Sequence, residues 1–355
     1  MIGDRLKLAR EAAGMSLRDL EAAMHGLVSA QAIGKYERDE MMPGSNVMLA
    51  ISKALQVSPE YLLSRNKIEL TGIDFRKDPH TSAKDERRVE ATILDKVEKY
   101  LELEELLPDG GLLWQAPSSP AFHINNIEAA EMAADQLREV WSLGLDPIPS
   151  MTELLEEKGV KVIALNLPIE VSGSKAFVKR ADHQEVPVIV VNDQHNGERQ
   201  RFTLAHELAH LILDFIDMND KDQEKAADRF AGAFLMAKEM VLNVLGKHRT
   251  LISFGELAEL KKIFKVSIAA LAVRCAQLGI LPKSVYYKLW HQIKALGWNS
   301  PNSNEPNQFA AEVPERMKRL CLKAVSEGAM TLSKAASLLN MTPRDFDKVM
   351  LEGSL

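Results

Sequence analysis

The feature that most constrains this chain is the pentapeptide His206-Glu-Leu-Ala-His210. Apolar residues recur around it with helical spacing and predict a helix over residues 199–214. On such a helix, two histidines four residues apart lie on one face, about one turn from each other. Two imidazoles so placed can bind one Zn²⁺, and Glu207 can hold the water that attacks a substrate. The pentapeptide therefore predicts a metal-binding helix.

A second helical run supplies the best candidate for a third ligand. A catalytic zinc site needs three protein ligands and one open position. Glu224 opens a helical run over residues 224–231, and Asp228 falls on the same side of it, four residues on. Glu224 is the predicted third ligand, and Asp228 is placed to hydrogen-bond the far nitrogen of a ligand histidine. Either motif alone also arises on ordinary helices, but together they favour a metal site.

Composition restricts the class of protein. The 355 residues, 46% of them hydrophobic, provide material for two or three domains with their own cores. No apolar run reaches membrane-spanning length, and the first residues carry charge where a signal peptide needs its apolar segment. Cys275 and Cys321 lie far apart, which indicates reduced thiols rather than a disulfide framework. These observations predict a cytoplasmic protein with no membrane segment.

The N-terminal region has the pattern of a helix-turn-helix domain. Gly14 ends a first short helix, Ser16 caps a second, and Ser29 caps a third after a tight turn. Five short helices in about 65 residues, with such a turn, are typical of this motif. The predicted helices cover residues 4–13, 17–24, 29–38 and about 46–55, with a fifth that ends near Leu63.

These residues resemble the Cro and phage-repressor (XRE) family. The resemblance is carried by Leu6, Arg10, Gly14, Ser16, Leu17, Leu20, Val28, Ser29, Ile33, Tyr36, Glu37, Pro43, Ile51, Ala54, Leu55, Val57 and Leu62. Two departures concern the turn: the chain between Leu20 and Ile33 is about two residues longer than is usual, and Glu21 replaces a small residue. We therefore expect an enlarged turn between the second and third helices, with the reading helix at a different angle.

The charge of this region does not by itself identify a DNA-binding surface. Residues 1–66 contain eight lysines and arginines and eight acidic residues, and the whole chain carries a net charge of −6. DNA contact must therefore come from local placement of positive groups. We expect Arg18 and Lys35 to contact phosphates, and Ala30 and Gln31 to read bases in the major groove. A helix-turn-helix used only for protein contacts is the alternative.

The middle of the chain predicts an α+β domain. Residues 66–86 read as a linker, and residues 87–107 form an amphipathic helix that suits either a homodimer or packing on the following domain. A small sheet is then expected to support the two metal-binding helices, with an edge suited to holding an extended peptide. The pattern predicts helices over 127–142 and 150–158, and strands over 160–165, 175–178 and 186–191.

Residues 85–282 resemble the ImmA/IrrE family of bacterial zinc metallopeptidases. The matching stretches are 145–149, 154–163, 201–210, 224–231, 234–236 and 264–279. The resemblance implies a gluzincin-like site in which His206, His210 and Glu224 bind zinc and Glu207 is the general base. It also implies protein substrates of the regulatory kind, often helix-turn-helix repressors cleaved under stress or phage induction. One departure is Ala237, where a proline usually follows Leu-Met. No oxyanion-stabilising residue is assigned, although His195, Arg199 and Tyr286 are nearby in sequence.

The last segment has a helical pattern of its own. Residues 299–307 read as a polar linker, and residues 331–344 resemble another small helix-turn-helix within a helical region over 312–350. Substrate docking, DNA contact and simple packing all fit this pattern.

The sequence thus predicts a mainly α fold with an α+β core. A five-helix DNA-binding domain is followed by a zincin-like metallopeptidase domain with a small sheet and by a C-terminal helical segment. The predicted divisions are 1–66, 67–110, 111–285 and 286–355.

Two functional hypotheses follow. In the first, the chain is a regulator that binds operator DNA and cleaves a repressor or toxin–antitoxin partner with Zn²⁺, or with Mn²⁺ in the cell. In the second, it is a repressor or antitoxin that neutralises a partner toxin, and its metal site is silent. The intact Glu207 favours the first, because a purely structural zinc site needs no base.

Overall fold

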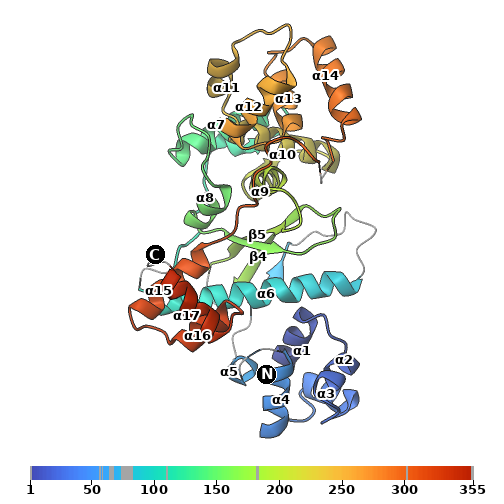
Figure 1. Ribbon diagram of the computed structural model, residues 1–355, viewed down its shortest axis with the longest axis vertical. Helices are drawn as coiled ribbons and strands as arrows, with labels where there is room; N and C mark the ends of the chain where they lie inside the picture. The colour runs from blue at the N-terminus through green and yellow to red at the C-terminus, as the bar shows by residue number, and fades with distance from the viewer. Residues whose placement is uncertain are drawn as a thin grey trace. The chain divides into compact units, whose positions relative to one another are not determined.

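The computed structural model describes residues 2–55, 57, 59–63, 68–72, 83–108, 111–180, 184–300 and 303–352 (Figure 1). Much of the predicted linker over 66–86 falls on residues 66–67 and 73–82, which lie outside this set. The chain divides into two compact units. The first unit comprises Met1–Leu113, Ala176–Val186 and Glu315–Leu355, and the second comprises Trp114–Lys175 and Pro187–Pro314.

The first unit begins with the five predicted short helices, which confirm the helix-turn-helix expectation. They are α1 (Ile2–Ala12), α2 (Leu17–Ala23), α3 (Ala30–Glu37), α4 (Ser45–Leu55) and α5 (Pro59–Leu63). Ser16 and Asp19 form a capping box at α2, in which each side chain accepts the other residue's backbone N–H, at 3.1 and 2.7 Å. Leu6, Leu20 and Ile33, each at most 1% exposed, form the centre of the small core.

Glu21 closes the turn between α2 and α3, which the sequence predicted to be enlarged. Its carboxylate accepts the backbone N–H of Ala30 at 3.1 Å, and Ser29 Oγ accepts that of Ala32 at 3.3 Å. Two N–H groups at the start of α3 are thereby satisfied, as helix N-termini require. The unusual glutamate noted in the sequence thus has a local structural role, because it ties the third helix to the second.

Helix α6 (Ala83–Leu106) is the longest element of the first unit and starts four residues before the predicted position. It contacts α1, β1 (Ile68–Thr71) and α15 (Arg316–Ser326). Ile93, Val97 and Leu103 on its apolar stripe are fully buried, and Glu98 forms a buried ion pair with Arg5. The stripe thus packs on elements of its own chain, and homodimerisation stays a prediction.

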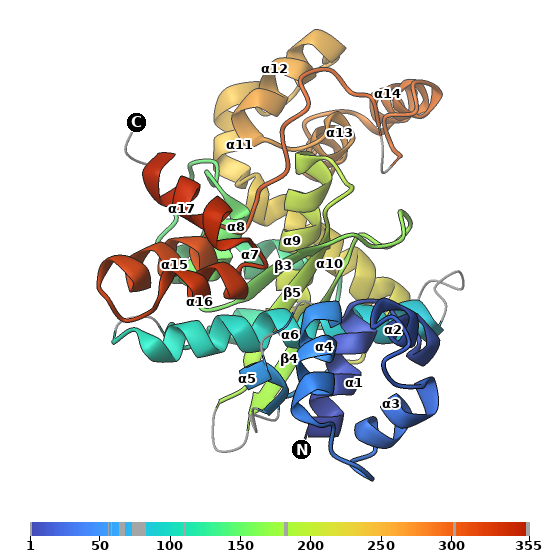
Figure 2. The same ribbon diagram turned by 60° about the horizontal axis from the view of Figure 1, so that its bottom comes forward.

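The C-terminal helices pack beside α6, as the two views agree (Figures 1 and 2). These helices are α15, α16 (Leu332–Leu338) and α17 (Pro343–Glu352). Phe346 and Cys321 are fully buried together with Leu103 of α6, and Arg316 donates a hydrogen bond to the Tyr100 hydroxyl at 3.1 Å. Of the three roles predicted for this segment, which are substrate docking, DNA contact and packing, this geometry favours packing.

The sheet contains parallel and antiparallel strands in the order β1-β4-β5-β3. Its strands are β1 (Ile68–Thr71), β3 (Lys161–Leu165), β4 (Gly173–Arg180) and β5 (Val186–Asn192). Strands β3 and β5 are parallel, with Lys161 opposite Val188, whereas β1 is antiparallel to β4, with Ile68 opposite Arg180. The sequence prediction placed residues 68–71 in a linker, which is wrong. A run of four residues carries too little local pattern, and its pairing with β4 decides the structure.

The second unit combines its part of the sheet with helices and confirms the α+β expectation (Figure 1). Helix α10 (Asp220–Leu235) packs on both α7 (Ala129–Val140) and α9 (Gly197–Ile212). Strand β2 (His123–Ile124) pairs in parallel with β6 (Asp214–Phe215). None of the described helices of the chain combines the length and apolar character needed to span a bilayer. The elements are η1 (Pro120–Phe122), β2 (His123–Ile124), α7 (Ala129–Val140), α8 (Met151–Glu157), α9 (Gly197–Ile212), β6 (Asp214–Phe215), α10 (Asp220–Leu235), α11 (Lys238–Leu245), α12 (Phe254–Phe264), α13 (Ile268–Gln277) and α14 (Lys283–Ala295).

Candidate metal centre

Helices α9 and α10 bring the three predicted metal ligands together. The Nε2 atoms of His206 and His210 are 3.2 Å apart. Glu224 Oε2 lies 3.3 Å from Nε2 of His206, and its Oε1 lies 3.6 Å from Nε2 of His210. Within the described part of the chain, this is the one group of three or more histidine, cysteine or acidic residues with metal-site spacing.

Helical periodicity explains why the histidines of α9 face outward from the core. Leu204, Ala205 and Leu208 are at most 1% exposed and hold the helix to the core. The side chains of His206 and His210, on another face, keep 17% and 14% exposure. The pattern that buries the apolar stripe therefore leaves both imidazoles partly exposed on a second face of α9.

Helix α10 positions the two acidic residues. Its N-terminus is capped by Asn219, whose side chain accepts the N–H of Asp222 at 3.0 Å. Its buried face includes Phe230, which stacks on Phe234 with ring centroids 5.6 Å apart. Asp228 lies one turn after Glu224, and its Oδ1 is 2.9 Å from Nδ1 of His206.

The donor set fits a divalent cation. In a tetrahedral zinc site with ligand distances of about 2.0–2.2 Å, neighbouring donor atoms are about 3.3–3.6 Å apart. The two Nε2 atoms are 3.2 Å apart, and each lies 3.3 or 3.6 Å from one of the two carboxylate oxygens of Glu224, which is close to that spacing. Two imidazole nitrogens and a carboxylate oxygen are ligands that zinc prefers, whereas a site for Mn²⁺ usually has more oxygen.

The electrostatics around His206 favour positive charge. Burial opposes the charged form of His206, but hydrogen bonds to Asp228 and Glu224 raise its pKa to about 10. The acidic groups therefore outweigh the cost of desolvation at the position where a cation would bind. A divalent ion would supply that charge and leave His206 Nδ1–H to donate to Asp228.

Glu207, on α9 next to His206, lies beside the candidate ligands and near Lys175 of β4. Burial raises its pKa, and the negative charge of Glu224 adds to this, while His206 and a backbone hydrogen bond from Lys175 oppose it. Lys175 also donates from Nζ to the carbonyl of His210 at 2.9 Å. A carboxyl with a raised pKa that is held by a backbone donor is suited to accepting and returning a proton near neutral pH.

The three residues considered as oxyanion stabilisers lie in different surroundings. His195 is buried, its Nε2 is 2.9 Å from the carbonyl of Ile169, and burial lowers its pKa. Tyr286 stacks on Trp290 of α14, with ring centroids 6.0 Å apart. Arg199 donates to the Ser172 hydroxyl at 2.8 and 3.2 Å. Their contacts assign none of them to the metal centre.

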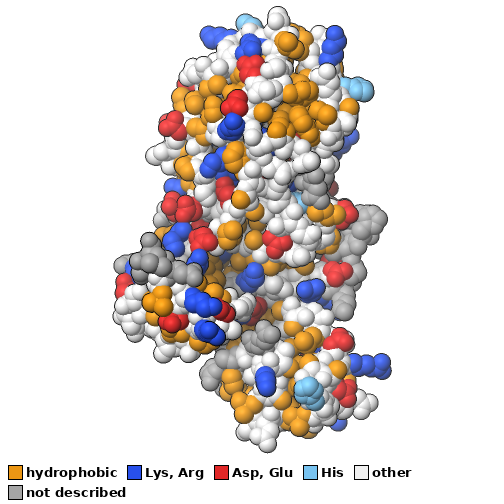
Figure 3. Space-filling view, in the orientation of Figure 1, with side chains coloured by type: hydrophobic (Ala, Val, Ile, Leu, Met, Phe, Trp, Pro, Cys, Tyr) orange, Lys and Arg blue, Asp and Glu red, His pale blue; other side chains and the backbone are white. Residues whose placement is uncertain are grey.

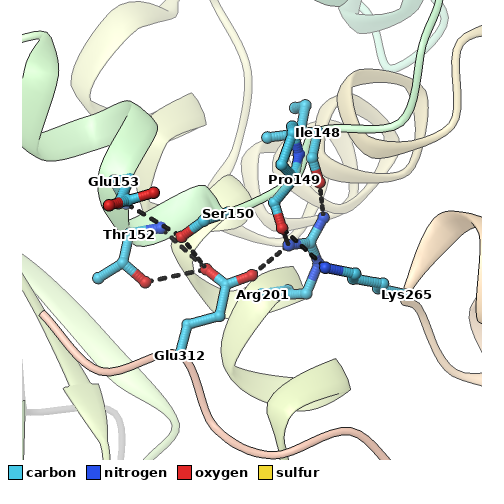
Figure 4. A network of polar contacts seen from close by, with 8 residues as sticks. All are labelled: Ile148, Pro149, Ser150, Thr152, Glu153, Arg201, Lys265 and Glu312. Atoms are coloured by element: carbon cyan, nitrogen blue, oxygen red, sulfur yellow. Dashed lines mark hydrogen bonds and ion pairs between the residues drawn. The ribbon is translucent and has the colours of Figure 1, made fainter. Parts of the chain in front are cut away.

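A buried arginine anchors α9 to the chain around residue 150 (Figure 4). Arg201 donates to the carbonyl of Ile148 at 2.7 Å and forms an ion pair with Glu312. Glu312 in turn accepts the backbone N–H and the hydroxyl of Thr152, both at 2.9 Å. Lys265 donates to the Pro149 carbonyl at 3.0 Å. The network fixes the orientation of the helix that carries the histidines.

A second buried network corrects part of the predicted polar linker over 299–307. Glu305 is 3% exposed, pairs with Lys261 at 2.9 Å and accepts the N–H of Ile268 at the start of α13. Lys261 also pairs with Glu198 of α9 at 2.6 Å. The polar composition of the segment is typical of a solvated linker, but a buried lysine distant in sequence neutralises its glutamate. Sequence reasoning therefore missed these positioning residues, because no local pattern marks them.

The predicted DNA contacts lie on the helix-turn-helix helices of the first unit. Gln31 and Lys35, four residues apart on α3, are exposed, as is Arg18 on α2, and Ala30 is half-buried. Basic and acidic side chains are interspersed on the face of this domain in view in Figure 3. Three of the four residues, Arg18, Gln31 and Lys35, are therefore accessible to a DNA duplex.

These features define a helix-turn-helix protein that also carries a candidate metal site of the metallopeptidase type. Residues 6–62 match a family profile described as "Helix-turn-helix". Residues 155–276 match a peptidase-family profile described as "IrrE N-terminal-like domain". The chain therefore combines an XRE-type helix-turn-helix domain with an IrrE/ImmA-like domain. A comparison with curated proteins found no match.

Proposed function

We propose that this chain is a cytoplasmic DNA-binding regulator whose second unit is a zinc-dependent endopeptidase acting on a regulatory protein of the repressor or antitoxin type. The observation that carries the proposal is the convergence of His206, His210 and Glu224 beside Glu207. A helix-turn-helix domain in the same chain supports a role in transcription, and the peptidase-family profile supports a protein substrate.

Each residue of the site has a separate role in this proposal. His206, His210 and Glu224 hold the ion, and Asp228 orients His206 through its Nδ1. A bound zinc ion would acidify a water molecule and polarise the carbonyl of the scissile peptide bond. Glu207 accepts the proton of the attacking water and passes it to the leaving amine. The backbone N–H of Lys175 keeps the Glu207 carboxylate in place between these two transfers.

The helix-turn-helix domain directs this activity to an operator. Arg18 and Lys35 contact phosphates, which sets the position of the domain on the duplex. Gln31, with Ala30 beside it, reads base edges at the start of α3. The exposed positions of Gln31 and Lys35 one turn apart support a common DNA-facing surface.

The enzyme hypothesis is tested with Glu207→Gln. The full-length protein with added Zn²⁺ is incubated with a peptide library prepared from a bacterial lysate, and new termini are identified by mass spectrometry. We expect cleavage products with the unaltered chain, none with Glu207→Gln, and unchanged products with the control Glu239→Gln, an exposed residue of α11.

The same variant separates the two functional hypotheses. If Glu207→Gln leaves both product formation and gene regulation unchanged, the peptidase proposal fails. The non-proteolytic repressor or antitoxin is then the better description.

A further inference from the structure

A pocket of about 310 Å³ lies in the second unit next to the metal centre. Its walls come from α9, α10, α13, α14 and the residues that follow α14. This volume is within the range of about 300–1,000 Å³ typical of ligand pockets. It also exceeds the space that one side chain fills, so the pocket suits a ligand with more than one group. The residues that carry the argument are Arg199, Phe202, Asp228, Gly232, Trp290 and Trp298.

The pocket continues from the back of the metal centre. Asp228 lines it and is the residue whose carboxylate is 2.9 Å from His206 Nδ1. Phe202 and Arg199 precede His206 by four and seven residues, so all three share one face of α9. Seven residues correspond to about 10 Å along the helix, which is the length of about three residues of extended peptide.

One part of the pocket is apolar. Trp290 stacks on Tyr286, and Trp298 packs edge-to-face on Phe254 with ring centroids 5.2 Å apart, so both indoles are held in place. Hydrophobic side chains gather on the face of the second unit over α13 and α14 (Figure 3). Gly232 keeps the wall open: a Cβ there would meet only Gln277 Oε1, at 3.8 Å. A bulky apolar group therefore fits between α10 and the indoles.

The other part of the pocket carries positive charge. Arg199 is exposed, and among the described residues its guanidinium donates to a neutral hydroxyl, that of Ser172. Among the described residues, no carboxylate forms an ion pair with it. The surrounding protein displaces water and lowers the pKa of Arg199, and the charge of Asp228 opposes this shift. A partly desolvated guanidinium with a neutral partner gains most from an incoming carboxylate.

The acidic residues of the wall are already engaged. Glu198 is 2% exposed and pairs with Lys261. Asp228 is engaged with His206. Among the described residues that line the pocket, Arg199 is the basic one, so an incoming carboxylate would pair with it.

We propose that this pocket selects the peptide substrate: it takes a bulky apolar or aromatic side chain, and Arg199 pairs with a neighbouring aspartate or glutamate about three residues from the scissile bond. The inference rests on the proposed peptidase function and specifies its substrate class. Charge complementarity at Arg199 and continuity with the metal centre through Asp228 support a peptide as the occupant. A free aromatic carboxylate has related chemistry, and the experiment distinguishes it.

The test measures binding without cleavage. The full-length Glu207→Gln chain with added Zn²⁺ is titrated calorimetrically with three blocked alanine hexapeptides that contain Phe-Glu, Phe-Gln or Ala-Glu at their centre. We expect the Phe-Glu peptide to bind about ten-fold more tightly than the other two. Gly232→Leu should abolish binding by filling the pocket. Because no turnover is required, this result is independent of whether the unaltered chain proves to be a peptidase.

A charge reversal provides the sharper control. Arg199→Gln should bind the Phe-Glu and Phe-Gln peptides equally, and Arg199→Glu should prefer a Phe-Lys peptide, a gain that misfolding cannot produce. Lys225→Gln, which removes an exposed α10 charge outside the pocket, should keep the original preference. Equal binding of Phe-Glu and Phe-Gln by the parent chain, or a preference that survives Arg199→Gln, would overturn the proposal. Binding of 3-phenylpropanoate more tightly than any peptide would also overturn it and assign the pocket to a free small carboxylate.

Discussion

The carboxylate of Asp228 and the imidazole of His206 face each other across α9 and α10, with Oδ1 2.9 Å from Nδ1. The opposite nitrogen of the same ring, Nε2, faces Glu224 at 3.3 Å. One histidine thus has a carboxylate on each of its nitrogens. If Nδ1 carries the proton, Nε2 has a free lone pair for a metal ion, which is the tautomer that a ligand histidine requires.

Asp228→Asn is expected to weaken metal binding without removing a ligand. An amide can still accept the Nδ1–H but carries no negative charge, so His206 becomes a poorer donor to the ion. Loss of such a partner typically costs about 10- to 100-fold in metal affinity. Competition with a zinc chelator measures the change, and Asp222→Asn, in the first turn of α10, is the control. Equal zinc affinity of Asp228→Asn and the parent chain would show that Asp228 does not support the ligand.

Glu312→Gln is expected to destabilise the second unit. Arg201, whose side chain is 1% exposed, would lose its ion pair and stay buried with its charge. Breaking one partner of a buried pair costs about 3–5 kcal/mol. Urea unfolding followed by tryptophan fluorescence measures the loss, and the exposed Glu157→Gln on α8 should change stability little. A Glu312→Gln protein as stable as the parent would contradict the role of this pair.

The same glutamate makes stability depend on pH in the acid range. Burial alone would raise the pKa of Glu312, but the charge of Arg201 and hydrogen bonds from Thr152 lower it. A lowered folded-state pKa contributes stability above the unfolded value of about 4.3 and loses it as pH falls through the folded value. The difference in the free energy of unfolding between the parent and Glu312→Gln should therefore be fully present at pH 7 and decrease below about pH 4. A difference that stays constant down to pH 3 would refute this.

Two glycines of the second unit are expected to respond oppositely to alanine. At Gly197, the first residue of α9, a Cβ would come within 2.3 Å of the Ala310 carbonyl oxygen, so Gly197→Ala forces backbone to move. Such overpacking typically costs about 1–3 kcal/mol. At Gly232, inside α10, there is room, and alanine should stabilise the helix by about 0.5–1 kcal/mol. Thermal unfolding of both variants compares them, and a neutral Gly197→Ala would show that the contact is not tight.

The two exposed residues of α3 are expected to affect DNA binding differently. Lys35→Ala should weaken binding to all DNA sequences, as loss of a phosphate contact does. It should also reduce the slope of log K against log salt concentration by about one. Gln31→Ala should reduce the discrimination between bases at one position of the DNA site by about 1–3 kcal/mol. Fluorescence anisotropy with DNA from upstream of the chain's own gene, at several salt concentrations, measures both. If neither substitution changes binding, α3 is not the reading helix.

Local patterns in the sequence determined much of this protein. Because helical spacing is regular, His206 and His210 share a face of α9, and Glu224 and Asp228 share a face of α10. Both relationships hold whatever tertiary contacts surround the helices. The caps formed by Ser16 and Ser29 are equally local, since each involves a backbone group three residues away. Such features can be predicted because their physical cause lies within a few residues of the chain.

The tertiary structure alone decided the rest. Strand β1 exists because of its pairing with β4, more than 100 residues later, and Glu305 is buried because Lys261 neutralises it. The distance between Glu224 and the two histidines, and the pocket at Arg199, depend on how α9 and α13 pack against α10. These contacts join residues far apart in sequence, so their energies appear only once the chain has folded.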